Sequence, residues 1–143
     1  MLHLKLLFLS VSFLTVPQIS GWGLLSTVEI VKGYDEFMSA EVDKPKFSKL
    51  LKDNEGSRIT LEGFMIPIQQ DTKVDYFVLS RFPYQSCFFC GAAGPETVVE
   101  VYVNDKVTYT EDRVKVEGTL KLNANNPLQL FYVLKDADVE LLD

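Results

Sequence analysis

Histidine is nearly absent from this sequence, and its absence limits the chemistry that the chain can perform. The 143 residues contain one histidine, His3, in a segment that we expect to be removed. A mature chain without histidine lacks the usual proton-exchanging side chain near pH 7, and a cysteine or serine nucleophile would lack its usual base. The sequence also has no phosphate-cradling glycine loop and no nucleotide-binding motif. Enzymatic activity is therefore not expected.

Cysteine, proline and glycine are also scarce. Two cysteines are too few for a disulfide scaffold, and six prolines and eight glycines without a repeat exclude collagen-like and low-complexity chains. A hydrophobic content of 47% in 143 residues is enough for one packed domain. The formal net charge of −6 opposes a surface that binds phosphate, so no nucleic acid is expected as a partner.

The first 23 residues have the layout of a secretory signal peptide. Lys5 precedes an apolar run over residues 6–16, and small residues follow. The run has about half of the ~20 apolar residues that a membrane-spanning helix needs. We therefore expect cleavage near residues 20–23, no transmembrane anchor after cleavage, and export to the periplasm or the cell envelope.

The chain beyond residue 56 alternates between apolar and polar residues, which is the pattern of half-buried β-strands. The clearest strand is 113–122, and others are predicted at 58–68, 74–82, 97–103 and 128–134. The acidic pairs at 111–112 and 136–138 are interpreted as turns. Five short strands predict a small barrel or a sandwich over residues 57–143.

Residues 24–56 are predicted to form an N-terminal cap segment that covers one end of the sheet. Its clearest element is a short helix from Pro45 to Lys52, in which Phe47, Leu50 and Leu51 share one face. Gly56 follows as a stop signal.

Two of the strands have similar sequences with a glycine at the same place, Gly63 in one and Gly118 in the other. Glycine inside a strand is typical of a bulge or a strongly coiled strand, which small barrels need. We therefore predict a mainly β fold, a small five-stranded antiparallel OB-like barrel with a short N-terminal helical cap. Gly63, Pro67 and Gly118 are assigned structural roles.

The segment from residue 82 to residue 97 contains both cysteines, Cys87 and Cys90. This spacing allows a disulfide, or half of a tetrahedral zinc site. Such a zinc site would need further ligands, either carboxylates such as Asp75 or Glu96 or two more cysteines from a second protomer. A third interpretation is that the aromatic residues cap the barrel and the cysteines are small buried hydrophobic residues. As a binding loop, the segment would use a larger set: Phe88, Phe89, Gly91, Gly94, Pro95 and Glu96.

Three parts of the sequence carry a family resemblance: the run from Ile59 to Ile68, which contains Gly-Phe-Met-Ile-Pro, residues 76–79, and the cysteine segment before Pro95. Together they resemble a family of exported bacterial domains of unknown function. Some relatives are encoded beside ABC transporter subunits in zinc-responsive operons. The resemblance implies no enzymatic activity, an envelope protein or ABC transporter as partner, and a link to zinc.

The cysteine segment departs from that family's pattern. Relatives have Cys-x-His before a proline run, whereas Phe89 stands here at the histidine position and Cys90 is an addition. The leading hypothesis is an exported, non-catalytic envelope accessory or binding domain. The alternative is a thiol-disulfide redox module that uses Cys87 and Cys90.

Overall fold

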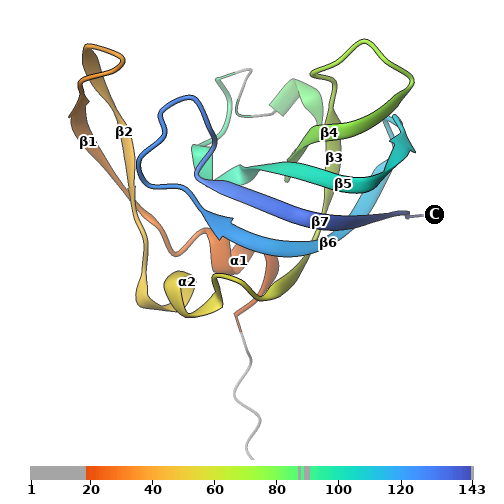
Figure 1. Cartoon of the computed structure of the whole chain (residues 1–143), viewed down its shortest axis with the longest axis horizontal. Helices are drawn as coiled ribbons and strands as arrows, with labels where there is room; N and C mark the ends of the chain where they lie inside the picture. The colour runs from red at the N-terminus through yellow and green to blue at the C-terminus, as the bar shows by residue number, and fades with distance from the viewer. Residues whose placement is uncertain (1–18, 87, 89–90, 143) are drawn as a thin grey trace, which may run out of the picture.

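The computed structural model describes residues 19–86, 88 and 91–142. These residues form two short α-helices, short 3-10 turns, a separate two-stranded hairpin and a closed five-stranded barrel (Figure 1). The helices are α1 (Gly21–Leu25) and α2 (Lys49–Asn54), and the hairpin consists of β1 (Glu29–Asp35) and β2 (Ala40–Lys46). The barrel strands are β3 (Arg58–Ile66), β4 (Lys73–Ser80), β5 (Val98–Thr108), β6 (Arg113–Leu122) and β7 (Tyr132–Leu141).

The strand order around the barrel is β3-β4-β5-β7-β6, and β6 pairs with β3 to close it. The expectation of a mainly β fold with a five-stranded barrel is confirmed. The expectation that all strands are antiparallel is wrong for one pair, because β5 and β7 run parallel. The chain reaches β6 before β7, and β7 then fills the gap between β5 and β6.

The main core lies inside the barrel, as the alternation along the strands predicts. Val99, Val101 and Val103 of β5 point inward, and Val114, Val116 and Leu120 of β6 join them. These side chains are at most 8% exposed. Burial of this apolar surface stabilises the fold at roughly 25 cal/mol per Å².

The first helix belongs to this core. Leu24 and Leu25 are 2% and 0% exposed, and Leu51 of α2 is fully buried beside them. The indole Nε1 of Trp22 donates a 2.8 Å hydrogen bond to the carbonyl of Glu62 on β3. The boundary that the sequence suggests after residue 23 therefore falls inside α1.

The fully buried Tyr132 connects α1 to the barrel, since its hydroxyl donates a 2.6 Å hydrogen bond to the carbonyl of Leu25. Burial, and then the negative charge of Glu96, raises the pKa of Tyr132 well above its ordinary value of 10. The folded protein therefore retains this proton at a pH where the unfolded chain releases it.

We expect the free energy of unfolding to fall as the pH rises above about 10, with a slope of up to about 1.4 kcal/mol per pH unit from this tyrosine. Tyr132→Phe should remove this part of the slope and cost about 1 kcal/mol at neutral pH through the lost hydrogen bond. Urea unfolding between pH 8 and pH 11 measures both effects. Equal alkaline slopes in the two proteins would contradict the assignment.

The cap segment differs from its prediction. Most of it forms the β1–β2 hairpin, in which Pro45 pairs with Ile30 rather than opening a helix. The helix begins later, because the side chain of Ser48 caps it by accepting a hydrogen bond from the Leu51 amide. Figure 1 shows the hairpin standing beside the barrel at the left.

The last strand also differs from its prediction. The acidic stretch at 136–138 lies inside β7 and is not a turn. Asp136 has a φ of +49°, and the register between β6 and β7 shifts opposite it, between Glu117 and Thr119. Aspartate tolerates this left-handed conformation better than most residues, so a bulge inside a strand imitates a turn in the sequence.

Both strand glycines lie where another chain segment comes close. A Cβ on Gly63 would lie 2.2 Å from the carbonyl oxygen of Ser80 on β4. A Cβ on Gly118 would lie 3.0 Å from the Cβ of Leu134, beside the bulge. Pro67 is exposed directly after β3. Within the described ranges, no helix is long and apolar enough to cross a membrane.

Candidate functional site

The cysteine segment is only partly described. Cys87, Phe89 and Cys90 lie outside the described residues, so the predicted disulfide or zinc ligands stay predictions. Phe88 is half-buried and packs against three aliphatic residues on the outer side of the barrel: Ile66, Val78 and Val98. Gly91 is exposed and has a φ of +76°, a conformation that favours glycine.

The end of this segment turns inward. Pro95 opens a short 3-10 helix (Pro95–Thr97), and the Glu96 carboxylate folds back over Gly94, where a Cβ would clash with it. Oε2 of Glu96 is buried, and no hydrogen-bond partner for it is found among the described residues. The charge of Glu96 acts on Tyr132 in the core. This carboxylate therefore faces the protein interior.

The outer face of β4 and β5 carries a second group of side chains. Val99 and Val101 point into the barrel, so the residues between and beside them point outward, among them Val98, Glu100 and Tyr102. Val98 joins the small cluster under Phe88. Phe88 thus lies against the same outer face as Glu100.

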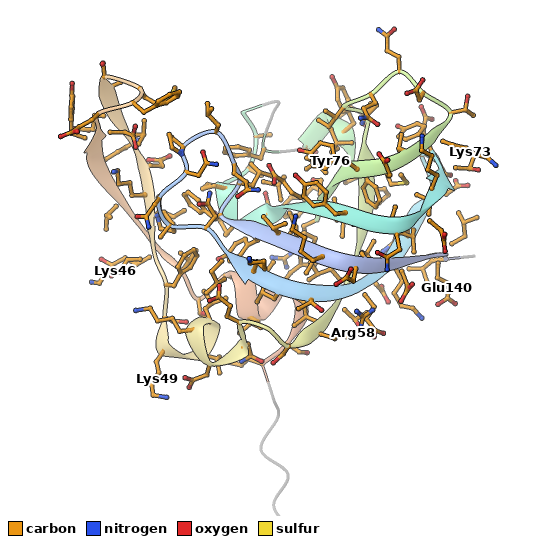
Figure 2. All side chains as sticks on the ribbon, viewed as in Figure 1. Lys46, Lys49, Arg58, Lys73, Tyr76 and Glu140 are labelled. Atoms are coloured by element: carbon orange, nitrogen blue, oxygen red, sulfur yellow. The ribbon has the colours of Figure 1, made fainter. Side chains whose placement is uncertain are left out.

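A cleft opens on this face where four segments meet. Ile68 of the β3–β4 loop, Tyr76 and Val78 of β4, Glu100 of β5 and residues 127–130 of the β6–β7 loop line it. We call it the Glu100 cleft. Its volume is about 220 Å³. Figure 2 labels Tyr76 on β4, and Figure 1 shows the β6–β7 loop between the hairpin and the barrel.

Glu100 is buried on the floor of this cleft, with 6% of its surface exposed. Its Oε1 accepts a long hydrogen bond, 3.4 Å, from the Leu130 amide. Its Oε2 is buried and has no hydrogen-bond partner of normal geometry in the described part of the chain. Among the described residues Glu100 forms no ion pair. A buried carboxylate oxygen without a hydrogen bond of normal geometry is costly, so Oε2 favours a ligand that donates one.

The loop over Glu100 is held in shape by Asn123. The Nδ2 group of Asn123 donates to the carbonyls of Asn126, Gln129 and Leu130 at 2.8 to 3.1 Å. Its Oδ1 accepts from the amides of residues 125 and 126. One side chain therefore fixes both ends of the loop, and the Leu130 amide is positioned before any ligand arrives.

Two tyrosines lie beside the carboxylate. The rings of Tyr76 and Tyr102 are 4.9 Å apart at 41°, and Nζ of Lys135 lies 3.8 Å from the Tyr102 ring centroid. Burial raises the pKa of Tyr76 to about 12, and the negative charge of Glu100, the neighbouring Tyr102 and a weak side-chain hydrogen bond to Glu100, outside normal geometry, add to the rise. Tyr76 therefore stays a neutral hydroxyl at physiological pH and cannot act as a base there.

A larger cavity of about 440 Å³ is lined in part by the start of the cysteine segment, residues 83–85. It is lined mainly by aromatic and apolar residues: Phe64, Met65, Pro67, Pro83, Tyr84, Gln85, Tyr109 and Glu111. In the described ranges the buried side-chain oxygens without a partner belong to Glu96 and Glu100. The larger cavity has no such group, so the Glu100 cleft is the stronger ligand site.

The arrangement around Glu100 combines a carboxylate acceptor, neutral phenols and apolar walls, which suits the binding of a hydrogen-bond donor. No group of three or more histidine, cysteine, aspartate or glutamate residues in the described part of the chain is placed to hold a metal ion.

Glu100 was not singled out from the sequence. One signal for it is present there: Glu100 interrupts an apolar run from Val98 to Val103, where a solvent-facing strand would have several polar residues. The rest of the cleft comes from segments far apart in the chain, so no local motif indicates it.

Fold and cleft together define a mainly β domain with a closed five-stranded mixed barrel and a cleft on its outer face. The fold is similar to the crystal structure, at 2.45 Å resolution, of a DUF3299 family protein from Pseudomonas aeruginosa PAO1. The two chains share 25% sequence identity with a TM-score of 0.51 over 69% of this chain and 68% of that chain. No family model matches the sequence, and no curated protein matches it significantly. The similarity supports a relationship to an uncharacterised bacterial domain family.

Proposed function

We propose that this chain is an exported, non-catalytic binding domain of the cell envelope, built on an OB-like barrel, and that it holds a partner in the Glu100 cleft. The observation that carries the proposal is Oε2 of Glu100, a buried acceptor on the floor of a preformed cleft that has no hydrogen-bond partner of normal geometry among the described residues. A folded domain retains such a costly group most readily where a ligand satisfies it.

The strand order supports the OB-like assignment. Consecutive strands β3, β4 and β5 pair in sequence, and β7 lies between β5 and β6 in a Greek-key arrangement. OB-folds bind ligands on the face of their second and third strands, between the loops after the first and fourth strands. The corresponding elements here are β4, β5, the β3–β4 loop and the β6–β7 loop, and all four line the Glu100 cleft.

Position-specific photo-crosslinking in the source cells tests the binding role. A benzophenone amino acid replaces Leu128, which lies at the cleft and is 69% exposed, and the matched control replaces Leu141 of β7, which is 59% exposed. We expect a discrete adduct from position 128 and none from position 141. Equal adducts from both positions, or none from position 128, would contradict the proposed role.

The mature chain gives a second expected result. Since Trp22, Leu24 and Leu25 pack into the domain, we expect signal cleavage on the N-terminal side of Gly21. Intact mass of protein purified from the envelope fraction measures this end. An uncleaved chain in the cytoplasmic fraction, or a mature chain that begins after Trp22, would contradict it.

The state of Cys87 and Cys90 follows from the same sample. Alkylation before and after denaturation separates a disulfide from a zinc-bound pair and from free thiols. Zinc handling, an ABC transporter partner and thiol-disulfide exchange remain predictions of the sequence. A disulfide that forms no mixed disulfide with a substrate thiol would exclude the redox alternative.

A further inference from the structure

We infer that the Glu100 cleft receives the side chain of an arginine from a partner protein, with the guanidinium donating to Oε2 of Glu100. The inference rests on the proposed function, because it names the chemistry by which a partner occupies the cleft. It is argued from the charge, the size and the walls of the cleft.

Charge favours a cationic occupant. The floor of the cleft is a buried carboxylate, and Lys135 lies over the ring of the neighbouring Tyr102, with no ion pair to Glu100 among the described residues. A guanidinium at Oε2 would form a charge-assisted hydrogen bond, which is roughly twice as strong as one between neutral groups. A carboxylate or phosphate ligand would instead meet a like charge on the cleft floor.

Size favours one side chain. The cleft volume of about 220 Å³ is below the 300–1,000 Å³ that is usual for small-molecule and cofactor sites. A cleft of this size suits a single long side chain that projects from the surface of a partner protein. The polar group at the bottom is reached through an apolar opening, since Ile68 and Leu128 at the mouth are 49% and 69% exposed.

The walls favour arginine. An arginine side chain buries its methylene stem against apolar surface while its charged end finds a partner, and Ile68, Val78 and Leu128 supply that surface. Its flat guanidinium is weakly hydrated and stacks on aromatic rings, and Tyr76 lines the cleft beside Glu100. These properties distinguish it from the compact, strongly hydrated ammonium of lysine.

The test uses short capped peptides, because the partner is not needed to probe the cleft. Acetyl-Gly-Arg-Gly-amide and acetyl-Gly-citrulline-Gly-amide have the same shape, and only the first carries the charge. Each is titrated into the ¹⁵N-labelled mature chain, and amide shifts are followed by NMR. We expect the arginine peptide to shift residues 76–78, 100 and 128–130, and to bind at least about tenfold more tightly than the citrulline peptide.

Two variants complete the experiment. Glu100→Gln keeps an oxygen for the Leu130 amide and removes the charge, and it should reduce affinity for the arginine peptide about tenfold or more. The control Glu140→Gln removes an exposed charge of β7 that pairs with Lys115, and it should leave affinity unchanged (Figure 2). The citrulline comparison needs no variant, so it decides the question even if Glu100→Gln unfolds.

Three results would overturn the inference: shifts outside the cleft, equal binding of the arginine and citrulline peptides, or methylguanidinium binding as tightly as the peptide. The last result would mean a site for small cations, without a contribution from the arginine stem. If one of these results is obtained and position 128 still gives a crosslink, the inference about arginine is wrong but the proposed binding role is not contradicted. Peptide binding without any crosslink would instead count against the proposed function.

Discussion

Replacing Gly63 with alanine is expected to lower the free energy of unfolding by at least about 3 kcal/mol, one of the two largest effects of a single substitution considered for this chain. A Cβ at this position would lie 2.2 Å from the carbonyl oxygen of Ser80, where no real Cβ atom is found. Backbone atoms of β4 have no alternative rotamer, so β3 and β4 would have to separate.

The separation would disturb the barrel at a sensitive place. Gly63 lies in the stretch of β3 that pairs with β6, and its neighbour Phe64 pairs with both β4 and β6. Moving β3 away from β4 therefore strains the closure of the barrel on both sides. Urea unfolding followed by circular dichroism measures the change, and thermal unfolding should show a midpoint lowered by roughly 10 °C.

Gly23→Ala is the matched control for this substitution. A Cβ at Gly23 would lie 3.5 Å from the side chain of Ile19, which is an ordinary contact, and alanine is favoured over glycine in a helix such as α1. Its free energy of unfolding should stay within about 1 kcal/mol of the wild-type value. A Gly63→Ala protein as stable as Gly23→Ala would contradict the close approach of β3 and β4.

The second large effect is expected for Leu25→Ala, which should cost about 3 kcal/mol in the free energy of unfolding. The side chain of Leu25 is fully buried in the main core, and its carbonyl accepts the hydrogen bond of Tyr132. Truncation removes apolar contacts and leaves a cavity that the closed barrel cannot fill by collapse.

Leu50→Ala provides the comparison, because Leu50 of α2 is 38% exposed and its truncation should cost less than about 1 kcal/mol. Both variants are measured in urea on the same mature chain. If Leu25→Ala loses no more stability than Leu50→Ala, then α1 is not part of the folded domain. The structure would then give no reason to expect cleavage on the N-terminal side of Gly21.

The barrel could be predicted because most of its strands have one buried face. Along β6, Val114, Val116 and Leu120 alternate with polar residues, and the alternation marks the strand at its observed bounds. The prediction of β7 was incomplete because a bulge at Asp136 places acidic residues inside the strand. Local composition cannot distinguish such a bulge from a turn.

The hairpin was not predicted because its strands bury little on either face. In β1 the residues from Glu29 to Lys32 are all exposed, so no alternation marks the strand, although its backbone pairs fully with β2. Pro45 added a misleading helix-start signal. When neither face of a hairpin is covered, backbone pairing alone imposes no alternation of apolar and polar side chains, so the sequence does not indicate the strands.

The Glu100 cleft was beyond local sequence reasoning for a different reason. Its walls come from the β3–β4 loop, β4, β5 and the β6–β7 loop, and only the barrel topology brings them together. The cysteine segment, which the sequence made the leading candidate, lies against the same outer face through Phe88. Phe88 of the predicted loop is therefore a neighbour of the observed cleft, since it packs against the cluster that contains Val78, and Val78 also lines the cleft.

The measurement that tests the central claim most directly compares crosslinking from position 128 in cells that express the wild-type chain or Glu100→Gln. If the buried carboxylate holds the partner, the adduct should fall at least about tenfold in Glu100→Gln, at equal levels of folded protein, and persist in the Glu140→Gln control. An adduct of equal yield in all three chains would contradict a partner held by Glu100.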